Sequence, residues 1–205
     1  MPISHKHKTI FVHIPKTAGT SVEVVLGVNG INETHLRSHK EEVINSVKFA
    51  PQHYTAKILK AHKRVQPFWD KYFKFSIVRH PYTRVLSEYF WVKGKTRQNL
   101  TFDSSDLTNH LKGYYSKIDN DHKLSQTDYL YNNDKFLVEK VFKFENIKSE
   151  FSKFALKKWP TAPNLRHIQK SSNKASYIDQ LTQYHKDFIY ELYDKDFKNF
   201  NYDKS

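Results

Sequence analysis

The stretch TIFVHIPKTAGTSVEVVLG, residues 9–27, decides the fold class of this chain. Its first part, Thr9 to Ile14, is mostly apolar or β-branched and is typical of a buried strand that ends before a proline. The loop PKTAGTS, Pro15 to Ser21, follows, and VEVVLG then has the apolar spacing of a helix that ends at Gly27. The sequence therefore predicts a strand, a tight loop and a helix in succession.

The same order of strand and helix recurs along the chain. FKFSIV, residues 73–78, predicts a second buried strand, and Pro81 is suited to the first position of the helix after it. Residues 140–144 predict a third strand, and apolar positions from 147 to 155 predict another helix, with Asn146 as its cap. This alternation implies an α/β fold with a parallel sheet covered by helices on both faces. Ligands of such sheets bind beyond the carboxyl ends of the strands.

Other segments give expectations about structure alone. Ser38 to Glu41 has the spacing of a capping box, and apolar residues up to Val47 predict a helix beginning there. Apolar positions from 178 to 192 predict a long amphipathic helix near the end. The polar termini, 1–8 and 198–205, are expected to fray. The length of 205 residues favours one domain over the whole chain, 1–205.

Composition narrows the classes of function. The chain has no cysteine, which excludes disulfides, thiolate metal sites and a cysteine nucleophile. It has no apolar run long enough to span a membrane and no signal region, so the expectation is a soluble, cytoplasmic protein without a membrane anchor. The net charge of +13 favours polyanionic ligands, whether nucleic acid, anionic glycan or a charged nucleotide.

The loop after the first strand has the composition of a phosphate site. Its small residues let the backbone approach an anion closely, and it opens a helix whose first amides are free. The spacing differs from GxxxxGK[ST], because Lys16 precedes Gly19, so a kinase or other nucleotide-binding enzyme of the P-loop type is a disfavoured alternative. A simple turn would explain Gly19 but not the lysine and three hydroxyl residues around it.

A second anion-binding pair follows the second strand. Arg79 ends the strand, and Ser87 lies eight residues later, two turns into the following helix. A guanidinium fork and a hydroxyl at that spacing suit a terminal phosphate. Read alone, Arg79 is equally compatible with a structural ion pair.

These two motifs resemble a known family. FVHIPKTAGTSVE and FSIVRHPYTRVLSEY are similar to the two phosphate-binding segments of carbohydrate sulfotransferases of the Golgi and heparan 2-O-sulfotransferase type and their bacterial relatives. Weaker blocks, HYTAKIL, QTDYL, VFKFENI, LRHIQKS and ELYDKDFKNFNYD, follow in the family's order. The resemblance implies a P-loop-NTPase-like three-layer sandwich with a central parallel sheet. It also implies transfer of a sulfuryl group from 3′-phosphoadenosine 5′-phosphosulfate, leaving adenosine 3′,5′-bisphosphate, without a metal ion.

The resemblance also assigns roles to residues of this chain. Lys16 would approach the bridging oxygen of the leaving phosphate, and Arg79 and Ser87 would hold the 3′-phosphate. The residues that would cradle the 5′-phosphate are Thr17, Ala18, Gly19, Thr20 and Ser21, and possible further contacts with the nucleotide are Lys170 and Ser172. The chain departs from the family at His80, where Asn or Asp is usual, which puts the cap of the following helix in doubt.

Sulfuryl transfer needs a base for the acceptor proton, and the sequence offers twelve histidines. His53 is the predicted base, because in the resembling 2-O-sulfotransferases a histidine stands at the corresponding block, and an ordinary histidine pKa of about 6.5 suits the task. His13 is a candidate for orienting the loop or for packing inside the strand, and His62, His80 and Glu88 are reserve candidates for the base. The His5 and His7 pair is not interpreted as a metal site.

The acceptor is expected to be a hydroxyl, with a glycan as the favoured class. Tyr129 and Tyr131 are the aromatic residues predicted to lie near it, although aromatic residues are more often part of the core. A basic nucleic-acid-binding module without catalysis is the third alternative, supported by charge alone, so no nucleic-acid partner is expected. The sequence does not indicate an oligomeric state.

Overall fold

The computed structural model describes residues 3–28, 40–94, 102–163, 165 and 174–204. The main sheet has the strand order β1-β2-β5-β8. Strands β2 (Thr9–Val12), β5 (Phe73–Val78) and β8 (Lys140–Lys143) are parallel, as predicted. Strand β1 (Ile3–Ser4) adds an antiparallel edge beside β2. The sheet is therefore mixed, with its parallel part at the positions that the apolar runs indicated.

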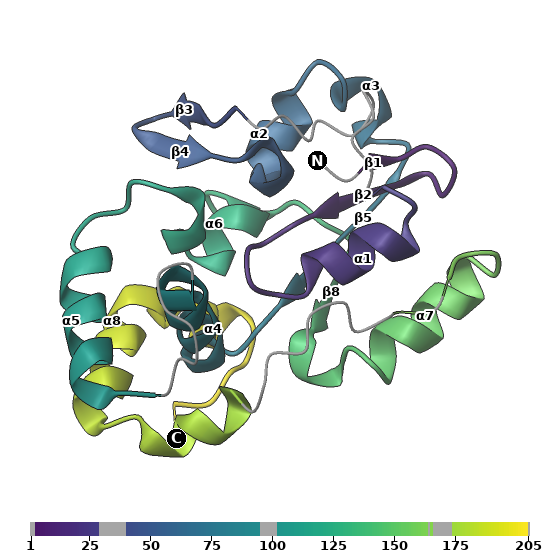
Figure 1. The fold of residues 1–205 in the computed structure, drawn as a ribbon. Helices are drawn as coiled ribbons and strands as arrows, with labels where there is room; N and C mark the ends of the chain where they lie inside the picture. Colours follow the sequence, from purple (N-terminus) through teal and green to yellow (C-terminus); the bar gives the residue numbers. More distant parts are fainter. Residues whose placement is uncertain (1–2, 29–39, 95–101, 164, 166–173, 205) are drawn as a thin grey trace.

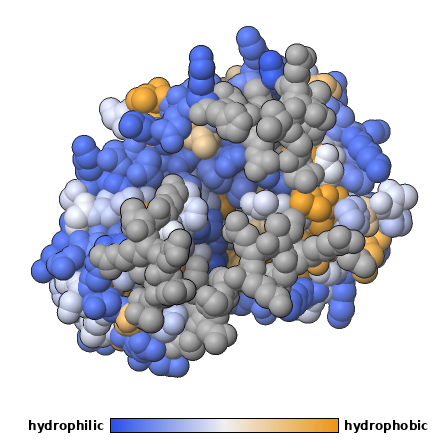
Figure 2. All heavy atoms as spheres, viewed as in Figure 1, coloured by the Kyte–Doolittle hydropathy of each residue, from blue (hydrophilic) through white to orange (hydrophobic). Residues whose placement is uncertain are grey.

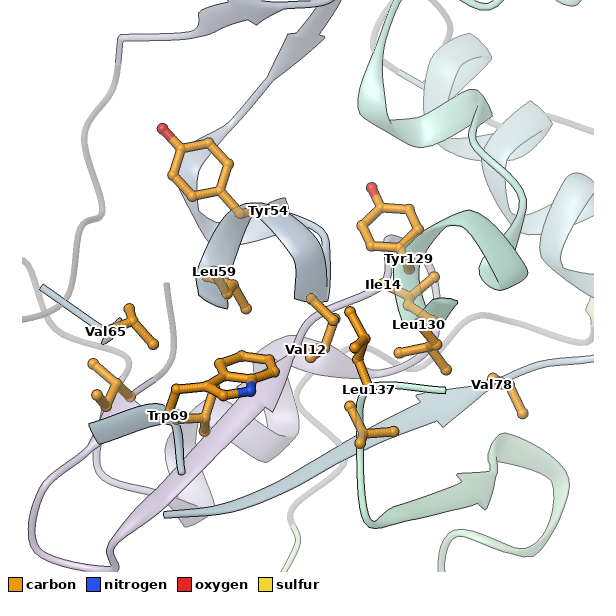
Figure 3. Close-up of a cluster of buried hydrophobic side chains, with 14 of the residues drawn as sticks. Val12, Ile14, Tyr54, Leu59, Val65, Trp69, Val78, Tyr129, Leu130 and Leu137 are labelled. Carbon is orange, nitrogen blue, oxygen red and sulfur yellow. The ribbon is translucent and has the colours of Figure 1, made fainter. Parts of the chain in front are cut away.

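Helices cover both faces of this sheet (Figure 1). On one face, Phe11, Phe75 and Phe142 pack against α1 (Gly19–Val25) and α7 (Glu150–Lys158). On the other face, Val12 and Val78 pack with residues of α2 (Ala56–Ala61), α3 (Gln66–Trp69) and α6 (Gln126–Leu130), as Figure 3 shows. Ile10 belongs to the same cluster. Alternate strand residues point to opposite faces, so these apolar runs serve two cores. The described residues thus form an α/β arrangement with the sheet between two helical layers.

A third apolar cluster joins helices beyond the carboxyl end of β5. It contains residues of α4 (Pro81–Gly94), α5 (Ser104–Tyr114) and α8 (Gln183–Asn199), together with the 3₁₀ segment η5 (Lys174–Gln180). Helices α4 and α8 lie side by side (Figure 1). The long helix predicted from 178 is therefore split, because η5 ends first and Thr182 caps α8 by accepting from the amide of His185. Pro81 begins α4, as predicted.

A two-stranded hairpin replaces one predicted helix. Residues 42–49 form β3 (Glu42–Ile44) and β4 (Val47–Phe49), so the prediction of a helix through Val47 is wrong. Asn45 and Ser46 have φ values of 50° and 66°, which make the two-residue turn that joins twisted antiparallel strands. Ser38 and His39, the start of that predicted helix, lie outside the described residues. A second hairpin comprises β6 (Tyr131–Asn132) and β7 (Lys135–Phe136).

Three short 3₁₀ segments complete the described elements that matter for the site. They are η2 (Pro51–His53), η3 (Asp121–Lys123) and η4 (Phe144–Asn146). Asn146, the predicted cap of the following helix, lies in η4, and α7 begins at Glu150 after Ser149.

Some residues in the described parts of both termini are packed, although these polar ends are expected from the sequence to fray. Ile3 is 3% exposed and pairs with Ile10, and the hydroxyl of Ser4 donates to the carbonyl of Leu26. At the other end, Phe200 is buried and the phenol of Tyr202 donates to Glu145. These sparse apolar residues bury on folding, although the segments around them are polar.

The molecular surface in the view of Figure 2 is mainly hydrophilic, with small separate apolar areas. Among the described residues, no helix combines the length and apolar character that crossing a membrane requires.

Candidate active site

The loop between β2 and α1 has a constrained backbone. Lys16 and Ala18 have φ values of 69° and 71°. These values lie in the left-handed region, which residues other than glycine and asparagine rarely adopt. The hydroxyl of Thr17 is fully buried and donates to the carbonyl of Ile14 at 2.9 Å, which closes the loop. Thr17 would therefore meet a phosphate through its backbone amide and not through its hydroxyl.

Gly19 is required by a histidine that lies against it. A Cβ atom at position 19 would be 1.9 Å from Nε2 of His13. His13 is itself fixed, because its Nδ1 donates to Oε1 of Glu23 at 2.8 Å and both side chains are buried. His13 is thus a packed, hydrogen-bonded histidine, one of the two roles that the sequence left open, and its ring lies against the loop at Gly19.

The remaining loop residues form the start of α1. No side chain caps Ala18, and the amide of Ser21 already donates to the carbonyl of Ala18 at 3.0 Å. The amides that precede it in the first turn of a helix lack a partner within the helix. The side chain of Thr20 is exposed and that of Ser21 is buried.

Two buried arginines support the loop, Arg79 from the turn between β5 and α4 and Arg84 from α4. Arg79 is 6% exposed and its Nη1 donates to the carbonyl of Lys16 at 3.2 Å, while its Nε donates to the hydroxyl of Thr83. Arg84 is 3% exposed, and its Nε donates to the carbonyl of Pro15 at 3.4 Å. Burial lowers the pKa of Arg79 to about 10, partly opposed by the charge of Glu145, so the guanidinium stays cationic at neutral pH.

Ser87 lies on α4, two turns after Arg79. Its side chain is buried, and its hydroxyl makes no hydrogen bond among the residues that the structure describes. Between Arg79 and Ser87, the ring of His80 occupies the capping position, since its Nδ1 accepts from the amide of Tyr82 at 3.3 Å. The histidine at position 80 therefore replaces the Asn or Asp cap with an imidazole.

His53 lies beside the loop on η2. Its Nδ1 donates to the carbonyl of His13 at 3.1 Å, which leaves Nε2 as the acceptor nitrogen. This Nε2 accepts a hydrogen bond from the side-chain amide of Gln52 at 3.2 Å. The pKa of His53 is lowered well below its ordinary value by burial, and then by the charges of His13 and His122. The imidazole is therefore neutral at neutral pH, which is the protonation state of a base.

A second histidine, which the sequence analysis did not single out, lies next to His53. The rings of His53 and His122 are 5.3 Å apart and perpendicular, and Nδ1 of His122 donates to Oε2 of Glu88 at 2.8 Å. Burial opposes ionisation of Glu88, but the hydrogen bond and charge of His122, together with the charge of Lys16, lower the pKa of this carboxyl. His122 belongs to the segment between 97 and 133, which has no clear periodicity, so no local signal distinguished it.

The tyrosines predicted to lie near an acceptor have other surroundings. Tyr129 is fully buried in the core cluster of Figure 3, and its phenol donates to the carbonyl of Asp121, so the prediction that it faces an acceptor is wrong. Tyr131 is half-buried and packs on Phe136 of the neighbouring strand.

The remaining candidates lie apart from His53 or outside the described residues. His80 donates through Nε2 to the carbonyl of Asp203, and the ring of His62 packs against that of Tyr54. Lys170 and Ser172 lie outside the described residues. Within the described ranges, no group of three or more His, Asp or Glu side chains is arranged to hold a metal ion.

The comparison with known families agrees with this arrangement. The family model described as "Sulfotransferase family" matches residues 1–203, which is nearly the whole chain. No curated protein matches the chain. No solved structure matches it either. The phosphate-type loop, the arginines that support it and the neutral imidazole beside it are consistent with this match. Because the family model matches almost every residue, the chain belongs to the sulfotransferase family.

Proposed function

We propose that this sulfotransferase moves the sulfuryl group of 3′-phosphoadenosine 5′-phosphosulfate to a hydroxyl of a carbohydrate. The observation that carries the proposal is the convergence of Lys16, Arg79 and His53 beyond the carboxyl ends of β2 and β5. Ligands of parallel sheets bind at this edge. A P-loop-NTPase-like three-layer sandwich, a single domain and a cytoplasmic location are all compatible with the proposed function. All three stay predictions from the sequence.

In the proposed donor site, the loop from Thr17 to Ser21 holds the 5′-phosphate through backbone amides and the hydroxyls of Thr20 and Ser21. Arg79 and Ser87 hold the 3′-phosphate, and the unused hydroxyl of Ser87 supports that role. Lys170 and Ser172 remain proposed nucleotide contacts. The positive charges of Lys16 and Arg79 offset the charge of the bisphosphate, so the proposal needs no metal ion.

In the proposed transfer step, the acceptor oxygen attacks sulfur in line with the bond to the 5′-phosphate. The new sulfur–oxygen bond forms as the old one breaks, and the electron pair of the broken bond stays on the departing adenosine 3′,5′-bisphosphate. Lys16 stabilises the charge that develops on the bridging oxygen. Nε2 of His53 takes the acceptor proton, a role that its neutral state and fixed tautomer permit.

A carbohydrate acceptor is proposed from the resemblance of the two phosphate motifs to carbohydrate sulfotransferases. The net charge of +13 is compatible with a carboxylated or already sulfated glycan. The heparan 2-O-sulfotransferase type is the proposed subtype, because the predicted base stands at that subtype's histidine block.

Calorimetric titration with adenosine 3′,5′-bisphosphate tests the donor site. Wild-type protein should bind the bisphosphate, and Arg79→Ala should weaken binding by at least about tenfold, because a charged hydrogen-bonding partner of the phosphate is lost. Arg64→Ala, at an exposed arginine outside the site, is the matched control and should bind within about twofold of wild type. Binding of ATP with magnesium but not of the bisphosphate would favour the kinase alternative and reject this proposal.

A further inference from the structure

His122 lies between the loop that carries Lys16 and the predicted base, His53. Its ring is perpendicular to that of His53 at 5.3 Å and stacks on the indole of Trp91 at 4.7 Å with an interplanar angle of 19°. The ammonium of Lys16 lies 4.9 Å from the centre of the same indole. His122 and Trp91 therefore adjoin both residues to which the proposed transfer step assigns chemistry.

Glu88 fixes the orientation of the His122 ring. This carboxylate is 1% exposed and accepts from Nδ1 of His122 at 2.8 Å and from the phenol of Tyr114 at 3.0 Å. Because Nδ1 donates its proton to Glu88, the neutral tautomer of this ring carries its lone pair on Nε2. That nitrogen makes no hydrogen bond among the described residues, and the nearest carboxylate oxygen, Oδ1 of Asp121, is 4.0 Å away.

The backbone of His122 is tied to both sides of the site. Nη2 of Arg84 donates to the carbonyl of His122 at 3.1 Å, and the same guanidinium donates to the loop at Pro15. Oδ2 of Asp121 accepts from the amide of Ala50 at 2.8 Å, directly before the turn that carries His53. The position of His122 relative to the loop and to His53 is thus set before any acceptor binds.

A purely structural role explains only part of this arrangement. The contacts of Nδ1 with Glu88 and of the ring with Trp91 would serve a packed histidine equally well. They do not account for an open Nε2 that adjoins the residues assigned to proton removal and charge stabilisation. An imidazole nitrogen held with its lone pair free is a hydrogen-bond acceptor for a hydroxyl group.

We propose that His122 and Trp91 form the acceptor subsite of this enzyme, an inference that rests on the proposed function. Nε2 of His122 accepts a hydrogen bond from a sugar hydroxyl next to the one that is sulfated. Trp91, which is 38% exposed, contacts the apolar face of the sugar ring. Glu88 is a positioning residue that acts through His122, while His53 takes the proton of the reacting hydroxyl. The acceptor class is therefore a sugar with two neighbouring free hydroxyls.

The test compares His122→Phe, His122→Gln and Glu88→Gln with wild type. Phenylalanine keeps a ring against Trp91 but removes the accepting nitrogen, whereas the amide oxygen of glutamine restores an acceptor. His110→Phe is the matched control, because His110 is a buried histidine of α5 whose ring stacks on Tyr114 and not on Trp91 or His53. The probes are chemically desulfated heparan and chondroitin polysaccharides with radiolabelled donor.

The subsite predicts a change in acceptor KM. His122→Phe should raise the acceptor KM at least tenfold with kcat within about threefold of wild type, and His122→Gln should recover much of the loss. Glu88→Gln should raise KM by a smaller factor, since its amide oxygen still accepts from Nδ1. His110→Phe should leave KM unchanged, and adenosine 3′,5′-bisphosphate should bind all variants within twofold of wild type.

Other outcomes reject the subsite. A fall in kcat of a hundredfold or more at unchanged KM would make His122 the proton acceptor, and unchanged kinetics in His122→Phe would make it structural. Wild type that binds the bisphosphate but sulfates none of the polysaccharides would reject the sugar subsite while leaving the donor site in place. Wild type that does not bind the bisphosphate would instead reject the proposed function itself.

Discussion

At the scale of single residues, the loop from Pro15 to Ser21 depends on contacts that hold an unfavourable backbone. Left-handed φ values at Lys16 and Ala18 cost on the order of 1 to 2 kcal/mol each. Arg79 and Arg84 donate to the carbonyls of two consecutive loop residues, Lys16 and Pro15. The two arginines therefore do more than supply charge, because they fix the shape of the loop that carries Lys16, the proposed catalytic lysine.

The role of Arg84 is tested by Arg84→Lys, which keeps the charge but loses the planar fork. Arg84 donates to the carbonyls of Pro15, His122 and Leu124, and one ammonium cannot reach all three at the same geometry. We expect the free energy of unfolding to fall by about 1 to 3 kcal/mol and bisphosphate binding to weaken, measured by denaturant titration and calorimetry. Arg64→Lys should change neither the free energy of unfolding nor bisphosphate binding. If Arg84→Lys had as small an effect as Arg64→Lys, the role given to Arg84 would be contradicted.

Gly19 is the residue whose side chain is excluded by packing. In Gly19→Ala the new methyl group meets the ring of His13, which Glu23 holds in place, so either the ring or the loop must move. We expect a loss of about 1 to 3 kcal/mol in the free energy of unfolding and weaker binding of adenosine 3′,5′-bisphosphate.

Gly113→Ala is the matched control for that change. Gly113 lies in α5 with open space around its Cα, so alanine should stabilise the helix by up to about 1 kcal/mol without affecting ligand binding. Chemical denaturation of the two variants should therefore give shifts of opposite sign.

At the scale of elements, the segment after α8 supports the turn that carries Arg79. The phenol of Tyr202 donates to Oε2 of Glu145, whose Oε1 accepts from the amide of His80. The ring of Tyr202 packs 5.1 Å from that of His80. The polar tail is thus part of the framework of the proposed donor site, because it holds the residue that follows Arg79.

Tyr202→Ala tests this connection. Loss of the ring and of its hydrogen bond should lower the free energy of unfolding by about 2 to 4 kcal/mol and weaken bisphosphate binding through Arg79. Tyr184→Ala is the control, since Tyr184 is exposed on the first turn of α8 and its removal should change both quantities little. Unchanged bisphosphate affinity in Tyr202→Ala would show that the tail stabilises the fold without shaping the site.

At the scale of the whole molecule, buried histidines make stability depend on pH. Burial, and then the charge of Lys93, lowers the pKa of His110 to about 4, and the pKa of His53 is lowered in the same direction. Above pH 6.5 such a histidine is neutral in both states and has no effect. As pH falls from about 6.5 to about 4, the unfolded chain binds a proton that the folded protein does not, so stability is lost.

Thermal unfolding between pH 4.5 and 7.5 measures this effect. We expect the melting temperature to decrease as the pH is lowered below 6.5. His110→Gln should make this decrease less steep, because the shifted pKa of His110 alone accounts for a loss of up to about 3 kcal/mol in the free energy of unfolding between pH 6.5 and pH 4. His5→Gln, at an exposed position, is the control and should retain the wild-type slope. A melting temperature that is flat across this range would contradict the assigned burial.

Much of the site was predictable because its key parts are local in sequence. The order of strand, loop and helix from Thr9 to Gly27 depends on neighbouring residues, and so does the Pro81 helix start that positions Arg79. The family resemblance added His53. The hairpin at 42–49 was missed because left-handed backbone at Asn45 and Ser46 outweighs a helical apolar spacing.

The sequence by itself determined the parallel strands, the phosphate-type loop and the family, because each follows from residues that are close together along the chain. Only the tertiary structure decided that His122 lies beside His53. The amide of Ala50 and the guanidinium of Arg84, each more than thirty residues away, fix the turn that carries it. Such contacts follow from packing the helices around the sheet, and no local pattern encodes which distant side chains will then meet.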